Sequence, residues 1–293
     1  MSKGSLRWLR GHLSPRGVHR WIAAWACTAA CFASSAATAL DNVAVQAVAV
    51  GSTAPAAGDE PDHGDPREAV LVGSSSFNQA FGVIIERQLA RWGYQVTRKG
   101  VGGAGLARPD FRDMNQVLDA LPISARTDAV FVYIGVNDAQ SLWLYPGERP
   151  SSSAVMLPFG SPTWEARYAE RTLGFYERIC QRGARRAIVL LPVDVTRSHL
   201  QQRLARIRDL QVQAAARSSC ATVLSTAGDS GQFAVGGVAK RLPDGFHLSQ
   251  FGATVVWDRL RGQVLGLLSL SSRGAPGLAP SDGTYAGRVT PFL

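Results

Sequence analysis

A serine-containing turn is the first feature of this 293-residue chain that could perform chemistry. The segment Gly73-Ser74-Ser75-Ser76-Phe77 follows a short apolar run and precedes an amphipathic stretch. A serine at such a strand-to-helix turn can expose its hydroxyl as a nucleophile, while its own N–H lies at the helix N-terminus. Serine clusters also cap helices, so this turn indicates catalysis only if the chain supplies a base for it.

A base with a carboxylate beside it occurs in Asp244-Gly245-Phe246-His247, directly before the last amphipathic stretch. An aspartate three residues before a histidine can accept the Nδ1 proton and leave Nε2 free as a general base. Among the histidines of the predicted domain, only His247 has a carboxylate at this spacing. The sequence therefore predicts a triad of Ser75, His247 and Asp244.

Two more segments could bind a developing negative charge. The run from Gly100 to Gly105 is rich in glycine, which lets backbone N–H groups approach a ligand closely. Asn137 follows the apolar run 129–134 and offers a side-chain amide donor, with Gly135 permitting a tight turn. Asn-Asp pairs are also common in structural turns after strands.

The same glycines satisfy G-x-G-x-x-G, the spacing of dinucleotide-binding loops. That motif requires a helix directly behind the glycines and an acidic residue at the end of the next strand. The segment 106–109 contains Pro109 and does not resemble a helix start, and the next strand ends in Ile134-Gly135. The pattern disfavours nucleotide binding.

The elements that must position these residues are short apolar runs alternating with longer amphipathic stretches. This alternation predicts an α/β fold, a three-layer α/β/α sandwich around a central parallel sheet. Ligands bind such sheets at the carboxyl ends of the strands, and all four segments lie at or near predicted strand ends. The predicted strands are 69–73, 94–97, 129–134, 187–191 and 221–224; the predicted helices are about 78–92, 111–121, 164–181, 199–216 and 250–268, with a long loop over 138–159.

The order of serine turn, glycine loop, G-x-N-D and D-x-x-H resembles the SGNH (GDSL-type) hydrolase superfamily over about 69–268. The chain is most similar to an exported bacterial branch with T-G-L-x-R-P-D-F, G-x-N-D-x-Q and D-G-x-H-[LF] blocks. Here these blocks are Ala104–Phe111, Gly135–Gln140 and Asp244–Leu248. The superfamily usually has Gly-Asp-Ser in its first block, and Ser74 stands at the Asp position.

The resemblance implies the flavodoxin-like form of the fold and a serine esterase with no cofactor and no metal. It implies Ser75 as nucleophile, His247 as base and Asp244 as its partner. The oxyanion hole would comprise the N–H groups of Ser75 and Gly103 and the Asn137 amide, with Gly105 the alternative to Gly103. Candidates for substrate binding are Gly105, Arg108, Asp110, Asp138, Gln140 and Trp143. For Arg108 and Asp110 the alternative, which we slightly prefer, is an ion pair that fixes the loop.

Charge along the chain points to export rather than nucleic acid. Residues 1–39 contain five basic side chains and no acidic one, and without them the formal charge falls from +9 to +4. A basic segment, the apolar run 21–32 and Ala37-Thr38-Ala39 predict a signal peptide over 1–39, with an uncleaved anchor as the alternative. A flexible linker (40–68), the hydrolase domain (69–270) and a loosely ordered tail (271–293) follow.

An exported chain has consequences for its cysteines and its partners. After cleavage at residue 39 only Cys180 and Cys220 remain, and either a disulfide or two reduced buried cysteines fit the pattern. We expect a periplasmic or secreted enzyme that acts on an acylated small molecule or glycan, with acetyl esters favoured. It would bind no nucleic acid and keep no stable membrane span. An O-acyltransferase using the same triad and an inactive glycan-binding protein are the alternatives.

Overall fold

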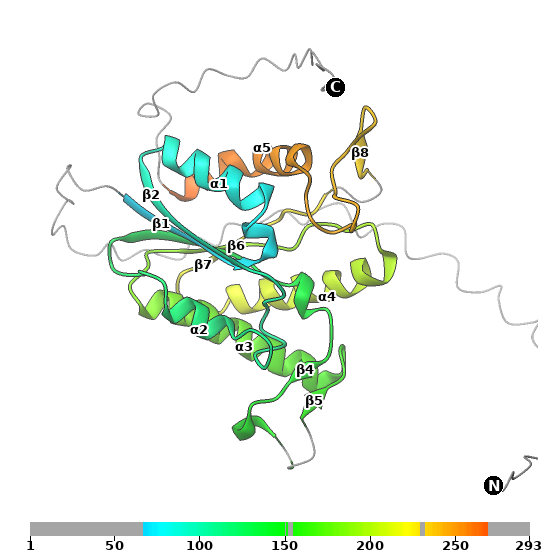
Figure 1. The fold of residues 1–293 in the computed structure, drawn as a ribbon. Helices are drawn as coiled ribbons and strands as arrows, with labels where there is room; N and C mark the ends of the chain where they lie inside the picture. The colour runs from blue at the N-terminus through cyan, green and yellow to red at the C-terminus, as the bar shows by residue number, and fades with distance from the viewer. Residues whose placement is uncertain (1–66, 150, 152–154, 229–231, 269–293) are drawn as a thin grey trace, which may run out of the picture. The chain divides into compact units, whose positions relative to one another are not determined.

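A five-stranded parallel sheet forms the centre of the structure, a computed structural model that describes residues 67–149, 151, 155–228 and 232–268. The strand order is β2-β1-β3-β6-β7 (Figure 1). All five predicted strands are present, and the predicted three-layer α/β/α fold is confirmed. Their bounds are β1 (Arg67–Ser74), β2 (Tyr94–Val101), β3 (Thr127–Tyr133), β6 (Ala187–Leu190) and β7 (Ala221–Leu224).

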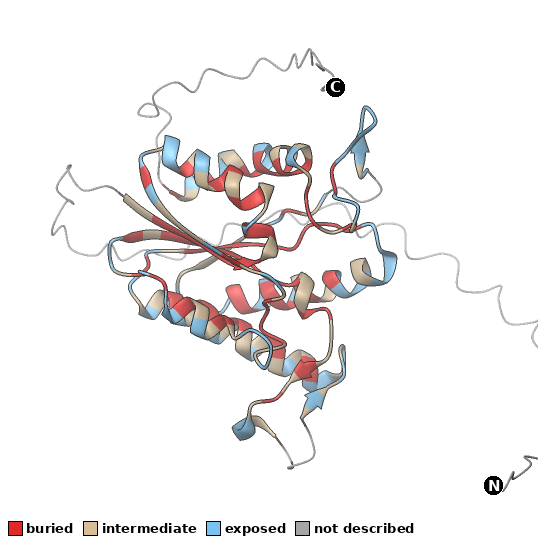
Figure 2. Ribbon diagram, in the orientation of Figure 1, coloured by how far each residue is buried: buried red, intermediate tan, exposed pale blue. Residues whose placement is uncertain are grey.

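Helices cover both faces of this sheet (Figure 1). One face carries α1 (Ala80–Arg91) and α5 (Gln250–Leu267). The other carries α2 (Met114–Asp119), α3 (Pro162–Gln181) and α4 (Ser198–Ala215). Figure 2 shows the central strands β1, β3 and β6 and the inward faces of the helices mostly buried, and the outward helix faces exposed.

The middle strand β3 shows why the central strands of the sheet are mainly apolar. Successive side chains of a strand point to opposite faces. Val130 and Val132 pack in the core on the α2–α3–α4 side, whereas Phe131 and Tyr133 pack in the core beneath α1 and α5. Both faces are covered, so neither set of positions can be polar without a buried partner.

Side-chain caps fix where several helices begin. Ser161 accepts a hydrogen bond from Trp164 N–H at the start of α3, and Ser249 accepts one from Gly252 N–H at the start of α5. Asp113 caps α2 through Asn115 N–H. Each cap satisfies a backbone donor that the first turn leaves without an intrahelical partner.

Two sequence predictions need correction or completion, and one hairpin was not predicted. The helix predicted at 111–121 is shorter, because Asp113 is its cap and the preceding residues form a turn. The predicted loop 138–159 contains a small antiparallel pair, β4 (Leu142–Trp143) and β5 (Met156–Leu157). A second hairpin, β8 (Ala234–Val235) and β9 (Val238–Ala239), was not predicted, and its two-residue turn is formed by glycines with positive φ.

The question left open for the cysteines is answered by a disulfide between Cys180, near the end of α3, and Cys220, directly before β7. The Cα atoms of the two residues are 5.8 Å apart. The bond joins an outer helix to the strand at the edge of the sheet.

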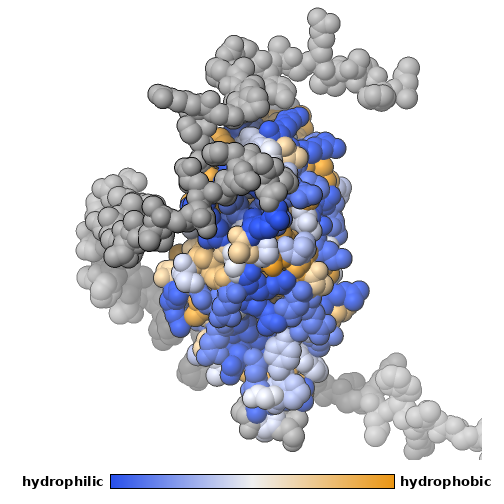
Figure 3. All heavy atoms as spheres, turned by 90° about the vertical axis from the view of Figure 1, so that its left-hand side faces the viewer, coloured by the Kyte–Doolittle hydropathy of each residue, from blue (hydrophilic) through white to orange (hydrophobic). Residues whose placement is uncertain are grey.

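Predictions for the signal peptide, most of the linker and the tail concern segments that lie outside the described residues. Within the described part, none of the helices is both long and apolar enough to cross a membrane. Figure 3 shows the side at which β1 begins; the described residues there are mostly hydrophilic, with apolar ones in small groups.

Candidate active site

The predicted catalytic residues gather where the strand order changes direction. The chain proceeds outward from β1 to β2 on one side, and through β3, β6 and β7 on the other. Such a switch point leaves a crevice at the carboxyl ends of the two central strands. Ser75 directly follows β1, and Asn137 lies in the 3-10 turn Val136–Asp138 just after β3.

The serine turn singles out one of its three serines. Ser74 and Ser76 are buried, whereas Ser75 is partly exposed at the start of the 3-10 turn Ser75–Phe77. The Ser75 Oγ lies 2.7 Å from Nε2 of His247. Ser74, which stands where the superfamily that the sequence resembles usually has Asp, is only 2% exposed.

Asn78 holds the serine turn in place from the end of that turn. Its backbone N–H donates to Ser75 O at 2.9 Å, and its side-chain amide donates to Gly100 O at 2.8 Å. A Cβ on Gly100 would lie 2.6 Å from Asn78 N, so only glycine permits this close approach. Asn78 thus ties the serine turn to the end of β2.

Asp244 and His247 form a compact acid–base unit before α5. One carboxylate oxygen of Asp244, Oδ2, lies 2.7 Å from His247 Nδ1. The other, Oδ1, accepts the backbone N–H groups of Phe246 and His247, each at 3.0 Å. These contacts assign the Nδ1 proton to the Asp244 side and leave Nε2 to accept the Ser75 hydroxyl proton.

The environment of Asp244 favours its charged form. Burial alone would raise its pKa, but the Phe246 N–H, the His247 ring and the His247 N–H outweigh burial and lower it. A second segment of the chain also holds the Asp244–His247 unit, because the Thr196 backbone N–H donates to Gly245 O at 3.0 Å. A Cβ on Gly245, where φ is +82°, would lie 2.2 Å from Thr196 Oγ1.

The glycine loop turns sharply after β2. Ala104 N–H donates to Val101 O at 3.2 Å, and Gly103 occupies the third position of this turn with φ +73°. That combination is a type II turn, which requires glycine or asparagine at this position. Gly105 is buried, and a Cβ there would lie 2.2 Å from Asp138 Oδ1. The two candidate glycines therefore differ: Gly103 forms the turn, and Gly105 makes room for Asp138.

Asn137 reaches this loop from β3. Its side-chain amide donates one proton to Ala104 O at 2.9 Å. The amide has two protons, so a second donor remains for a ligand. Gly135, with φ +131°, makes the turn that brings Asn137 forward, as expected from the sequence.

Asp138, expected to contact substrate, is fully buried. Its Oδ1 accepts Ala107 N–H at 2.8 Å and its Oδ2 accepts the Tyr168 hydroxyl at 3.0 Å. Burial raises its pKa to about 6 in spite of these donors. This position gives Asp138 a role in holding the glycine loop rather than in touching a ligand.

The remaining candidates for substrate binding lie close to the glycine loop and are linked to one another or to the loop by hydrogen bonds. Arg108 makes a two-pronged ion pair with Asp110, at 2.8 and 2.7 Å. Gln140 donates to Asn137 O at 2.5 Å and accepts from Arg108 at 3.5 Å. Trp143 is partly buried, and its backbone N–H donates to Ala107 O at 2.8 Å. The Arg–Asp pair that fixes the loop, one of the two expectations for Arg108 and Asp110, is present.

Sequence reasoning missed the supporting residues Asn78, Thr196 and Tyr168. Asn78 was placed only as a helix start, and the other two lie about 50 and 30 residues from the groups they hold. None of them belongs to a recognisable motif, and contacts over such separations depend on the fold. Within the described residues, no group of three or more His, Cys, Asp or Glu side chains could hold a metal ion.

Comparison with known proteins gives a family match and distant structural similarity. A family described as "Protein of unknown function (DUF459)" matches residues 68–262. No curated protein matches the chain significantly. An alpha/beta hydrolase enzyme from the metagenome of Lake Arreo, Spain, is 16% identical, with 69% of this chain and 95% of that chain covered and a TM-score of 0.47.

Two further structures are similar at the same level. An acetyl xylan esterase from Geobacillus stearothermophilus is 15% identical (67% and 93% covered, TM-score 0.45). A member of the lipolytic protein G-D-S-L family from Veillonella parvula is 13% identical (67% and 96% covered, TM-score 0.46). Likeness this distant leaves the function to be argued from the geometry of the site.

Proposed function

We propose that this chain, which belongs to the family described as Protein of unknown function (DUF459), is a serine esterase of the SGNH type. The observation that carries the proposal is the continuous relay from Ser75 Oγ through His247 to Asp244, with both contacts at 2.7 Å. A nucleophile, its base and an orienting carboxylate in this order are the groups that nucleophilic catalysis of acyl transfer requires.

The reaction follows from these positions. Ser75 Oγ attacks the ester carbonyl carbon while His247 Nε2 takes the hydroxyl proton. The carbonyl oxygen becomes an oxyanion, which we assign to the N–H groups of Ser75 and Gly103 and to the free amide proton of Asn137. His247 then gives its proton to the departing alcohol as the C–O bond breaks. A water molecule, activated by His247, hydrolyses the acyl-enzyme and returns Ser75 to its starting state.

Asp244 stays ionised through this cycle. Its lowered pKa keeps the carboxylate charged beside the imidazolium that forms when His247 accepts the proton. The two backbone N–H groups on Oδ1 prevent the carboxylate from rotating, so Oδ2 remains aimed at Nδ1.

Intact-protein mass spectrometry after treatment with a serine-reactive fluorophosphonate tests this proposal. We expect one adduct that maps to Ser75 and is absent in Ser75→Ala and His247→Ala. Hydrolysis of p-nitrophenyl acetate should be lost in the same variants. Wild-type protein that is folded yet forms no adduct would contradict the esterase and favour a binding protein that retains the fold.

We also propose that the natural substrate is an O-acyl ester, with acetyl favoured, and that the enzyme acts outside the cytoplasm. The Cys180–Cys220 disulfide supports this location, because such bonds persist in oxidising compartments. Cell fractionation, with the N-terminus of the isolated protein sequenced, tests it. Recovery of the protein in the cytoplasm with its first residues intact would contradict export.

A further inference from the structure

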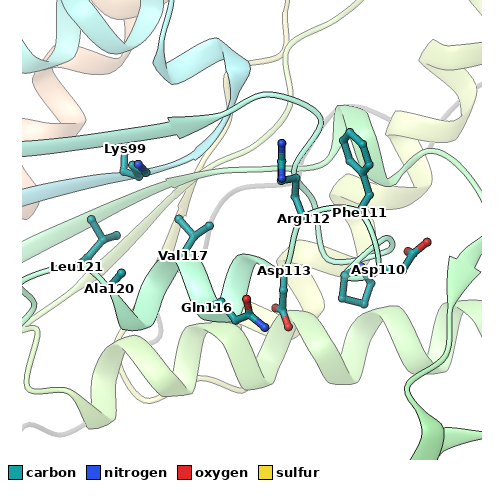
Figure 4. A pocket seen from close by; sticks show the side chains of 10 residues that line it. Lys99, Asp110, Phe111, Arg112, Asp113, Gln116, Val117, Ala120 and Leu121 are labelled. Carbon is teal, nitrogen blue, oxygen red and sulfur yellow. The ribbon is translucent and has the colours of Figure 1, made fainter.

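A groove lies beside the glycine loop, outside the triad (Figure 4). Its volume is about 540 Å³, and its walls come from the end of β2, the turn before α2, and α2 itself. In Figure 4 the side chains of Val117, on α2, and Leu121, just after the end of α2, extend toward β2, and Lys99 lies on that strand. The groove thus has an apolar floor and an open side.

Phe111 connects this groove to the proposed oxyanion hole. Phe111 is 59% exposed, more than any other large apolar residue among those that the structure describes. A Cβ on Gly103 would lie only 2.6 Å from Cε1 of the Phe111 ring, so the ring lies against the backbone of the glycine loop. In the sheet, Val101 at the end of β2 pairs with Ser74, which directly precedes Ser75. Lys99 lies two residues before Val101 on the same strand.

The carboxylates along the groove have hydrogen-bonding partners, whereas two of its cations have no carboxylate partner. Asp110 is paired with Arg108, and Asp113 accepts hydrogen bonds from Asn115 N–H and the Tyr145 hydroxyl. Lys99 and Arg112 have no carboxylate partner among the residues that the structure describes. The Arg112 guanidinium lies 5.3 Å from the centre of the Phe111 ring.

This combination fits one chemical class of ligand. The exposed ring of Phe111 offers a flat apolar surface to the C–H face of a sugar. The two cations without carboxylate partners on the groove attract an anion. A neutral acyl chain would use the apolar floor but would leave both cations without a role.

We propose that the groove binds the alcohol portion of the ester and that this portion is an anionic saccharide carrying carboxylates, such as a chain of uronic acids. Phe111 supports the sugar ring nearest Ser75. Lys99 and Arg112 bind carboxylates of the saccharide chain. This proposal rests on the proposed esterase function and adds the class of its substrate.

The test compares kcat/KM of the full chain for an acetylated oligogalacturonate and for a neutral acetylated xylo-oligosaccharide of equal length. We expect the wild type to prefer the anionic substrate by about tenfold or more at low ionic strength, and less at high salt. The double variant Lys99→Gln/Arg112→Gln should lose most of that preference. The control Arg91→Gln removes an exposed cation from α1, on the opposite face of the sheet, and should keep it.

A wild type with no preference, or a preference unchanged in the double variant, would overturn the groove assignment while leaving the esterase intact. A failed esterase is recognised separately, by the absence of Ser75 labelling. Calorimetric titration of Ser75→Ala with the oligogalacturonate tests the groove even then. Salt-sensitive binding that the Lys99 and Arg112 substitutions remove would support the proposal, and absence of binding would refute it.

Discussion

The proposed acid–base pair and the proposed oxyanion hole are built in opposite ways. Asp244 and His247 lie three residues apart, and the contacts that orient them come mainly from the same four-residue segment. The glycine loop is instead held by side chains from distant elements: Asn137 and Asp138 after β3 and, behind them, Tyr168 of α3. The first half is a local structure, and the second exists only when the domain is folded.

This difference teaches where each half is vulnerable. Substitutions in the Asp244–His247 unit should change the positions of protons and lower activity while leaving the fold intact. Substitutions of the buried polar groups that hold the glycine loop should lower both activity and stability. Variants of Asp244, Asn137 and Asp138 distinguish these two effects.

Asp244→Asn should have the largest effect and leave the fold intact. The backbone N–H groups of Phe246 and His247 require an acceptor at Oδ1, so the amide group of asparagine must face His247 Nδ1. Nδ1 then becomes the acceptor and Nε2 carries the proton, which is the wrong tautomer for a base. We expect kcat to fall on the order of 10⁴-fold.

The measurement is kcat for p-nitrophenyl acetate together with the unfolding midpoint. A variant that keeps a tenth of the wild-type kcat would show that the carboxylate does not set the tautomer of His247. Loss of activity together with a large drop in the unfolding midpoint would show that Asp244 stabilises the whole domain and not only the orientation of His247.

Asn137→Ala probes the oxyanion half and should lower kcat by about 10²–10³-fold with a smaller change in KM. The substitution removes the amide proton assigned to the oxyanion and the hydrogen bond to Ala104 O. Steady-state kinetics with p-nitrophenyl acetate separates the two parameters. A raised KM with unchanged kcat would move Asn137 from stabilising the oxyanion to binding the ground state.

The same division explains what the sequence could predict. Four strands, β1, β3, β6 and β7, were placed within two residues of their bounds because each is a mainly apolar run. The strand predicted at 94–97 continues to Val101, because its second half contains Arg98 and Lys99 and gives no apolar signal. The Asp244–His247 unit was found because its spacing is local. The role of Asp138 was not found, since the sequence places it beside Asn137 without showing that β3 delivers it into the core. The short α2 and the β4–β5 pair were missed because their limits depend on the Asp113 cap and on tertiary contacts rather than on periodicity.

Asp138→Asn should have the smallest effect of the three and should be visible mainly in the pH dependence of stability. The raised pKa of about 6 means that the folded protein binds this proton more tightly than the unfolded chain. The contribution of Asp138 to stability is therefore greatest below about pH 4 and is lost as the pH rises through about 6. Asparagine can still accept the Ala107 N–H but carries no charge to bury.

Denaturant unfolding of wild type and Asp138→Asn between pH 4 and 8 measures this. As the pH rises to about 6, the free energy of unfolding of the variant should increase relative to that of the wild type, by roughly 3 kcal/mol at most. Above that pH the difference between the two should stay constant. Asp258→Asn, which removes an exposed carboxylate from α5, is the matched control and should follow the wild type. A constant difference across the range would mean that Asp138 stays ionised when buried, so that its hydrogen bonds from Ala107 and Tyr168 outweigh the cost of burial.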